Sequence, residues 1–346
     1  MTGVSFVVPV HNGAACVGET IASILAQSDG RPMEIIVVED GSRDNSAAVL
    51  ESMTAVCPLT VISGPGRGAA AAVNAGVRIA RYPIICQVDQ DVVLEPGWLT
   101  ALVACLSNPA VAAAQGRYIV DGNASFFARI TGLDLEQRYA HLEEHPNHVC
   151  TGNTAYRASA LHAVGLLDDS MGYGYDNDLS YRLQAAGYRL AFCRAARSRH
   201  RWREGWTGYL AQQYGFGYGR LDVVARHPQR WMGDAVSPVS MMAHPLIMAM
   251  ALCLLGAGGL LATSLPWSNT LVTAGLALVL VLAIERTVTC IRLWKRFGDS
   301  AALAFPLVHL ARDVAWVAAV VVWTYRRVLR RGVKPEHSMM PRAAAR

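Results

Sequence analysis

The stretch Ile84-Ile85-Cys86-Gln87-Val88-Asp89-Gln90-Asp91 joins a short apolar run directly to two carboxylates. Ile84–Val88 has the length and composition of a buried strand. Two acidic residues at positions i and i+2, where the chain turns off a strand, could both approach one divalent cation such as Mg²⁺ or Mn²⁺. For the tripeptide alone, a polar loop after a strand is the simpler interpretation. The choice between them depends on the neighbouring segments.

Those neighbours alternate between strand and helix patterns. Strands are predicted at Val4–Val10 and residues 34–38, 59–62 and 84–88, with helices at residues 15–27, 45–53, 68–80 and 98–107. This alternation predicts an α/β fold with a mainly parallel sheet flanked by helices. Such sheets bind ligands at the carboxyl ends of their strands. Glu39-Asp40 and Asp89-Gln90-Asp91 each follow a strand, so we expect them to meet at one edge.

The remaining part of the body is less regular. Helices are predicted at residues 133–144, 159–164 and 177–186, and a strand at residues 188–193. Residues 202–218 are rich in aromatic side chains and basic at both ends, a composition typical of a membrane interface.

Charged residues are distributed unevenly along the 346-residue chain, and none occurs in residues 235–284. We therefore predict a body over residues 1–235, a membrane domain over residues 236–335 and a flexible tail over residues 336–346. Residues 245–262 and 270–291 are long enough for a membrane hairpin, within a segment at about 240–291. Arg312 and Asp313 favour an interfacial or partly inserted third helix at residues 303–325.

Charge and cysteine usage narrow the class of protein. The net charge is +5, and basic clusters flank the apolar segments, as expected on the cytoplasmic side of a cell membrane. The N-terminus lacks the pattern of a signal peptide, so we expect the body to face the cytoplasm. The body contains no basic stripe with interleaved aromatics, so nucleic-acid binding is not predicted. The eight scattered cysteines indicate neither a disulfide framework nor a zinc site.

Four further residues could carry chemistry. Asp40 could accept hydrogen bonds from a nucleobase or ribose, or it could close a turn before a helix. Asp176 could be a general base, or an acidic residue that stabilises a helix start. His200 could bind a metal, or lie in a solvated basic loop. Asn74 lies in an Ala-rich helix, where a surface or packed amide is the simpler interpretation.

Taken in order, these motifs resemble those of family 2 glycosyltransferases. The matching segments, within roughly residues 3–220, are Val7-Val8-Pro9-Val10-His11-Asn12, Val38-Glu39-Asp40-Gly41-Ser42, Asp89-Gln90-Asp91, Gly152-Asn153, Tyr175-Asp176-Asn177-Asp178-Leu179 and His200. The resemblance implies a GT-A fold, a nucleotide-sugar donor, a divalent cation, and inversion at the anomeric carbon by a single displacement.

Site roles are carried over residue by residue. The positions expected to bind the nucleotide-sugar are Pro9, His11, Val38, Asp40, Asn74 and Asp89. Asp91 and His200 are expected to hold the metal, and Asp176 to be the catalytic base. The chain departs from the family where Tyr175 stands in place of a frequent Glu, and where His11 replaces a commoner Tyr. The QxxRW signature of processive synthases is absent, which favours non-processive transfer.

The body and the apolar tail together predict transfer of one sugar to a membrane-located, lipid-linked acceptor in cell-surface glycan assembly. Polyprenyl phosphate itself is an alternative acceptor. A non-catalytic membrane scaffold on a transferase-like body is a competing hypothesis from a different class. A nucleotidyltransferase would require a Gly-rich basic loop after the first strand, where this chain has His11-Asn12-Gly13.

Overall fold

The fold is described from a computed structural model, in which residues 2–262 and 266–329 are placed. These residues form two compact units. The first contains the chain up to Ala124 together with Arg138–Trp202, and the second contains Ser125–Gln137 and the described residues from Arg203 onward. Each unit is described by itself. The flexible tail predicted at residues 336–346 lies outside the described residues.

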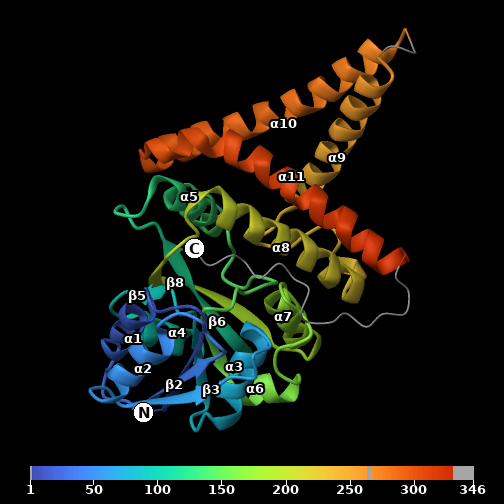
Figure 1. The fold of residues 1–346 in the computed structure, drawn as a ribbon. Coiled ribbons are helices and arrows are strands. Elements are labelled where there is room, and N and C mark those ends of the chain that lie inside the picture. Colours follow the sequence, from blue (N-terminus) through green and yellow to red (C-terminus); the bar gives the residue numbers. More distant parts are fainter. Residues whose placement is uncertain (1, 263–265, 330–346) are drawn as a thin grey trace. The chain divides into compact units, whose positions relative to one another are not determined.

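The first unit is built on one eight-stranded sheet with the order β3-β2-β1-β4-β7-β6-β8-β5. One half of this sheet is parallel and confirms the α/β class (Figure 1). Its strands are β1 (Val4–Val10), β2 (Met33–Glu39), β3 (Leu59–Ser63) and β4 (Ile84–Val88), and its helices are α1 (Val17–Leu25), α2 (Ser46–Thr54) and α3 (Ala69–Ile79). β1 and β4 begin and end at the residues predicted from the sequence.

The other half of the sheet is mixed. β7 (Asn153–Arg157) runs antiparallel to β4 and to β6 (Val111–Ile119), while β8 (Arg189–His200) is parallel to β6 and antiparallel to β5 (Val92–Leu94). The sequence predicted only the start of β8. It missed β6 because consecutive alanines have a weak strand propensity, and it missed β5 because that strand has only three residues. β7 is as long as β4, but its sequence Asn-Thr-Ala-Tyr-Arg contains no apolar run. The helices of this half are α4 (Trp98–Cys105), α6 (Ala158–Ala163) and α7 (Tyr175–Ala185).

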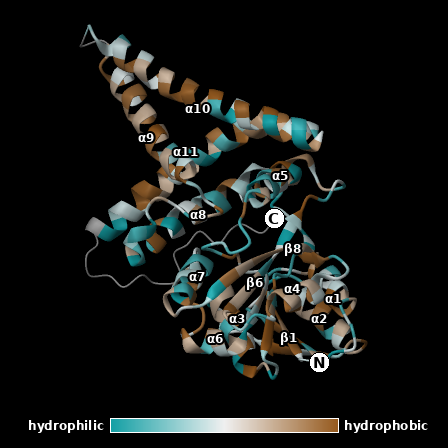
Figure 2. Ribbon diagram, turned by 180° about the vertical axis from the view of Figure 1, so that it is seen from behind, coloured by the Kyte–Doolittle hydropathy of each residue, from teal (hydrophilic) through white to brown (hydrophobic). Residues whose placement is uncertain are grey.

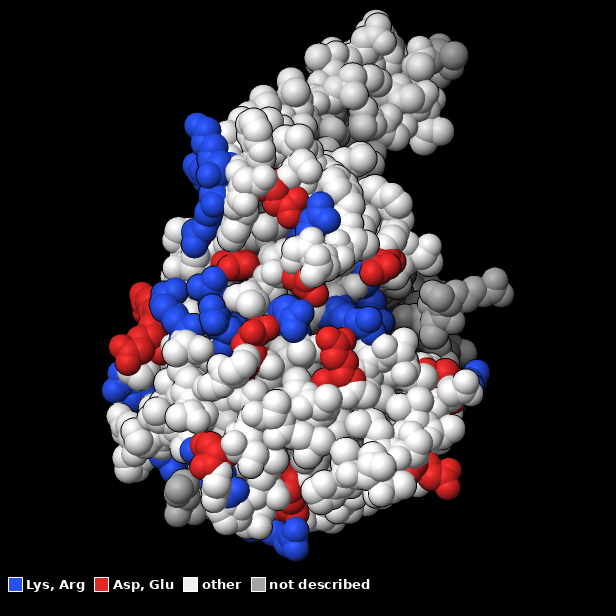
Figure 3. Space-filling model, turned by 90° about the vertical axis from the view of Figure 1, so that its left-hand side faces the viewer, with Lys and Arg blue, Asp and Glu red and all other residues white. Residues whose placement is uncertain are grey.

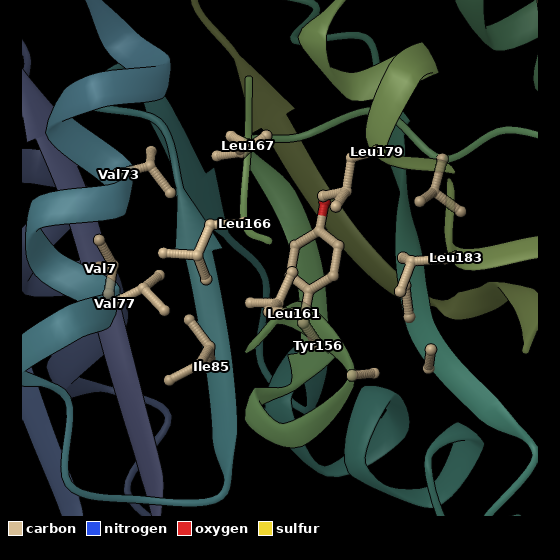
Figure 4. Packing of buried hydrophobic residues seen from close by; sticks show 14 of the residues in the cluster. Val7, Val73, Val77, Ile85, Tyr156, Leu161, Leu166, Leu167, Leu179 and Leu183 are labelled. Atoms are coloured by element: carbon tan, nitrogen blue, oxygen red, sulfur yellow. The ribbon is translucent and has the colours of Figure 1, made fainter. Parts of the chain in front are cut away.

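A continuous apolar core lies under the parallel strands. Val7 and Ile85 point from the sheet toward Val73 and Val77 of α3, and the cluster continues through Tyr156 to leucines of α6 and α7 (Figure 4). Helix and strand approach closely at Gly76, where an added Cβ would lie 2.5 Å from a methyl carbon of Val7. This packing fixes the parallel strands, and therefore the positions of the loops at their carboxyl ends.

The second unit is helical. It contains most of α5 (Phe126–Ala140), followed by α8 (Gly205–Arg226), α9 (Val239–Leu260), α10 (Ser268–Phe297) and α11 (Phe305–Thr324). α8 packs on α11, because Gly217 leaves room for Trp316, and the indole of Trp323 donates a hydrogen bond of 2.8 Å to Asp222. The sequence predicted that the body would extend to residue 235. In the structure, residues 203–235 belong to the same compact unit as the apolar helices, and α8 packs on α11 there. The predicted boundary between a body and a membrane domain stays a prediction.

Three described helical segments are long and apolar enough to cross a membrane: Val239–Leu260, Ser268–Phe297 and Ser300–Arg327. Their lipophilic character is visible in Figure 2, and Figure 3 shows no charged side chain at the α9–α10 end of the face that it displays. Two of these segments correspond to the predicted hairpin. The third meets the same criteria of length and composition, although the sequence favoured an interfacial or partly inserted helix.

Buried charges join these three helices. Asp313 of α11 accepts hydrogen bonds from Arg286 of α10 at 2.8 Å and from Arg312 at 3.2 Å. Arg286 also donates to Glu285 at 2.8 Å, and Nε2 of His244 in α9 lies 3.7 Å from the same carboxylate. Asp313 and Arg286 are 1% and 3% exposed. Removing one partner would leave a buried charge uncompensated.

We therefore expect Asp313→Ala to destabilise the membrane unit by about 3–5 kcal/mol. Thermal unfolding of the detergent-purified protein measures this effect. Thr287→Ala, at an exposed position of the same helix as Arg286, is the matched control and should change little. The double variant Arg312→Met/Asp313→Leu should recover much of the loss, because it removes both members of one buried pair while Arg286 keeps its hydrogen bond to Glu285. Equal melting temperatures for Asp313→Ala and Thr287→Ala would contradict this account.

Candidate active site

The carboxyl ends of the parallel strands gather most of the predicted polar residues. His11 follows β1, Asp40 follows β2, and Asp89 and Asp91 follow β4. Because β1 pairs in parallel with both β2 and β4, these residues share one edge of the sheet. The structure therefore brings together residues that are separated by up to about eighty positions in the sequence.

Asp89, Asp91 and His200 form a compact cluster at this edge. One ligand atom from each lies within 4.8 Å of the others, and Oδ1 of Asp91 is 3.6 Å from Nε2 of His200. The imidazole is held by aromatic rings: Trp202 stacks on it at 4.2 Å between ring centroids, and Tyr118 meets it edge-on at 5.4 Å. Two carboxylates and an imidazole suit Mn²⁺ or Mg²⁺, so this donor set fits the predicted cation.

Strand pairing explains how His200 reaches a residue more than a hundred positions away. β5 follows Asp91 directly and runs antiparallel to β8, so that Val92 lies opposite His200. The backbone N–H of Arg201 then donates to the carbonyl oxygen of Asp91 at 2.9 Å. β5 is only three residues long, but its pairing with β8 holds Asp91 next to His200, the two proposed metal ligands.

Asp89 is electrostatically strained in the metal-free protein. Burial, and then the negative charges of Asp91 and Asp176, raise the pKa of its carboxyl from 3.8 to about 7, although the side chain of Gln87 donates a hydrogen bond of 2.9 Å to it. Asp176 is therefore close enough to act on Asp89. Gly152 makes this crowding possible: its φ is +85°, and an added Cβ would lie 2.2 Å from Oδ2 of Asp89.

The raised pKa of Asp89 predicts how stability depends on pH. Between 3.8 and about 7 the folded protein binds a proton that the unfolded chain has lost, so the stabilisation is full below that window and is lost as pH rises through about 7. The melting temperature of the metal-free protein should fall as pH rises toward about 7 and level off above that, and the fall should be smaller in Asp89→Asn. Differential scanning fluorimetry in chelator measures both. Parallel curves would contradict the raised pKa.

Gln90, the residue between the two acids, anchors the end of β1. Its side chain accepts a hydrogen bond from the backbone N–H of His11 at 2.8 Å and donates to the carbonyl oxygen of His11 at 3.1 Å. Nδ1 of His11 is 3.0 Å from the carbonyl oxygen of Asp40. A side chain at Gly13 would meet Gln90 at 2.4 Å. Gln90 therefore fixes the loop expected to contact the nucleotide, a role that the sequence did not indicate.

Asp40 holds the glycine-rich loop before α3. Its two carboxylate oxygens accept hydrogen bonds from the backbone N–H groups of Gly66 at 2.7 Å and Gly68 at 2.9 Å, and the residue is 6% exposed. Both oxygens are thus already used within the protein. Pro9 and Val38 lie near the carboxyl ends of β1 and β2, and both side chains are buried. Contacts of these three residues with a nucleotide stay a prediction.

Asn74 lies away from this cluster, in the middle of α3. Its amide donates to the carbonyl oxygen of Leu167 at 2.8 Å and accepts from the N–H of the same residue at 3.0 Å. The side chain is buried and connects α3 to the segment after α6. We therefore leave Asn74 out of the proposed site, in favour of the packed-amide interpretation.

Asp176 lies in the first turn of α7, after Gly174 in the left-handed conformation. Its Oδ1 accepts a hydrogen bond from the N–H of Asn177 at 2.9 Å, and its Oδ2 lies 3.5 Å from Nε2 of the buried His148. Asp178 instead pairs with Arg182 at 2.7 Å. The sequence prediction missed His148. The only available signal was the His-x-Cys spacing of His148 and Cys150, which is too common to be decisive.

Comparisons with known proteins find glycosyltransferases. Residues 5–165 match the family model described as Glycosyl transferase family 2. The pre-mycofactocin glycosyltransferase of Mycobacterium tuberculosis is 31% identical over 255 residues, which cover 70% of this chain and 52% of that protein. The poly-β-1,6-N-acetyl-D-glucosamine synthase of Staphylococcus epidermidis is 25% identical over 198 residues, covering 55% and 48%. The chain thus spans about half the length of these curated relatives.

The fold also resembles a solved structure, that of a mannosyltransferase from Pyrobaculum calidifontis in complex with GDP-Man and Mn²⁺. The TM-score is 0.60 and the identity 18%, with coverage of 94% of this chain and 87% of the other. At this identity the likeness shows the fold alone. It confirms the GT-A type of sheet that the motifs implied.

Proposed function

Because residues 5–165 of this chain belong to glycosyl transferase family 2, we propose that the protein transfers one sugar from a nucleotide-sugar to a membrane-located acceptor, with inversion and with a divalent cation. The acceptor that we favour is lipid-linked, and the pathway is cell-surface glycan assembly. The observation that carries the proposal is the cluster of Asp89, Asp91 and His200 beside Asp176 at the carboxyl edge of the sheet.

Asp91 and His200 would hold the cation, and Asp89 would lie on the side of the diphosphate or ribose. When bound, the cation supplies positive charge that stabilises the leaving diphosphate. The alternative in which Asp89 is also a metal ligand fits the same donor set, because its carboxylate lies within 4.8 Å of the other two ligand atoms. In either arrangement a bound cation would offset the burial and the charge repulsion that together raise the pKa of Asp89.

Asp176 would accept the proton of the acceptor hydroxyl as that oxygen attacks the anomeric carbon. The N–H of Asn177 fixes one carboxylate oxygen, which leaves Oδ2 as the proton acceptor. Gln90 and Asp40 would act as positioning residues, since they hold the loops that border the nucleotide. Tyr175, the residue before the base, offers no second carboxylate.

The apolar helices support a membrane-located acceptor, because three described segments are long and apolar enough to span a bilayer. We propose a multi-pass protein of the cell membrane with its catalytic unit in the cytoplasm. The acidic cluster argues against a non-catalytic scaffold, since a scaffold gains nothing from adjacent carboxylates that repel each other.

A transfer assay tests this proposal. Membranes containing the protein are incubated with radiolabelled UDP-, GDP- and dTDP-sugars, with Mn²⁺ or with chelator, and the products are separated into organic and aqueous phases. We expect one donor to give a cation-dependent product in the organic phase. Label found only in the aqueous phase would contradict a lipid-linked acceptor. Donor binding without transfer, in a calorimetric titration with Mn²⁺, would support the scaffold.

A further inference from the structure

A second group of side chains that could bind a metal ion includes the proposed base, Asp176. His148, Cys150 and Asp176 each offer a ligand atom, and these atoms lie within 4.8 Å of one another. The closest printed approach is 3.5 Å, between Nε2 of His148 and Oδ2 of Asp176. In tetrahedral zinc sites, ligand atoms are about 3.3–3.8 Å apart, given the usual bond lengths. Small rotations of these side chains would therefore complete three corners of a tetrahedron.

Hydrogen bonds between side chains and the backbone fix the segment that contains His148 and Cys150 against α7 before any ion binds. Ser180 of α7 accepts a hydrogen bond from the N–H of Val149 at 3.1 Å and donates to its carbonyl oxygen at 3.3 Å. The N–H of Cys150 donates to Gln115 at 2.7 Å, and Thr154 donates to the carbonyl oxygen of Cys150 at 2.6 Å. The spacing between the His-x-Cys segment and α7 is thus set by the fold.

The cluster of His148, Cys150 and Asp176 is formed by the fold itself and is accessible to an ion from solution. His148 is 4% exposed, whereas Cys150 and Asp176 are half-buried and so accessible to an ion from solution. Three protein ligands would leave a fourth position for water or a substrate group, as in open zinc sites. The ligand types also differ from those of the Asp89, Asp91 and His200 cluster, because a thiolate is soft and binds Mg²⁺ or Mn²⁺ poorly.

We propose that His148, Cys150 and Asp176 form a site for Zn²⁺ that is separate from the cation site at Asp91 and His200. The sequence indicated no zinc site, because the chain contains no pair of neighbouring cysteines. The fold supplies the missing ligand from another segment: a His-x-Cys pair before β7 meets an aspartate at the start of α7.

One consequence rests on the proposed function. An Asp176 carboxylate that binds Zn²⁺ cannot accept the proton of an acceptor hydroxyl, so Zn²⁺ should inhibit transfer. Excess Mg²⁺ should not relieve this inhibition, because Mg²⁺ does not compete for the thiolate. The structure thus predicts a transferase that requires Mg²⁺ or Mn²⁺ and is inhibited by Zn²⁺.

Metal titrations of the full-length, detergent-purified protein test the site itself. The Asp91→Ala background is used, so that the first cluster cannot bind the probe. Co²⁺ should give a thiolate-to-metal charge-transfer band in this background, and Zn²⁺ should abolish that band. Cys150→Ser should remove the band and weaken Zn²⁺ binding by at least about 100-fold, since loss of an outer-shell partner alone costs 10–100-fold.

Cys57→Ser is the matched control. Cys57 is also half-buried, but it lies before β3, at the amino end of the parallel strands, and should leave the band unchanged. An unchanged band in Cys150→Ser would overturn the proposal, as would its absence in the Asp91→Ala background. A Cys150-dependent band without Zn²⁺ inhibition of the wild-type enzyme would support the metal site and contradict Asp176 as the base. The two failures are thus distinguishable.

Discussion

Asp91→Ala should abolish cation-dependent binding of the nucleotide-sugar and lower transfer by on the order of 10³-fold or more. The expected size follows from the several kcal/mol that a bound cation contributes to charge stabilisation in a transition state. Asp91 directly precedes β5, and its Oδ1 lies 3.6 Å from Nε2 of His200; the residues of β5 itself, Val92–Leu94, offer no carboxylate that could replace it. Calorimetry with Mn²⁺ and kinetics with the donor identified in the transfer assay measure the two effects.

Glu51→Ala is the control for this variant. Glu51 is an exposed carboxylate of α2, and its loss should leave both binding and transfer within about twofold of the wild type. Near-normal transfer by Asp91→Ala in the presence of chelator would show that the cluster has no catalytic role. A loss of donor binding in both variants would instead indicate damage to the fold, which circular dichroism checks.

The parallel half of the fold was predictable because its physical signals are local. β1 is rich in valine and β4 in isoleucine and valine, and a polar residue directly follows each strand, so hydrophobic runs and polar residues mark the same boundaries. β6 gave no such signal, because Ala112, Ala113 and Ala114 are buried by tertiary contacts and not by strand propensity.

Some residues of the site could likewise be predicted from local signals, and others could not. Asp89 and Asp91 could be placed from one rule about strand ends, and the motif order supplied His200 and Asp176. His148 could not be found, because its partner is 28 positions away and the two meet only through the folding of α7 onto the segment before β7. Gln90 looked like a spacer between two acids, although it ties two loops together. Asp40 has a further role that its position did not indicate, since its carboxylate holds the glycine-rich loop, and its contact with a nucleotide stays a prediction.

Asp176→Asn should leave donor binding intact and lower kcat by about 10²–10⁴-fold if the acceptor is a hydroxyl group. The amide has the same shape, and its oxygen can still accept the hydrogen bond from the N–H of Asn177. The loss should therefore appear in kcat and not in the dissociation constant of the nucleotide-sugar. Steady-state kinetics and calorimetry with the same donor separate the two quantities.

The same variant discriminates between the two classes of acceptor. A polyprenyl phosphate is already anionic and needs almost no base, so with that acceptor Asp176→Asn should retain most of the wild-type rate. Asp91→Ala should be inactive with either acceptor, because the leaving diphosphate is common to both. A large loss in Asp91→Ala together with a small one in Asp176→Asn would thus favour the phosphate. Large losses in both would favour a hydroxyl, since only that acceptor has a proton for Asp176 to remove.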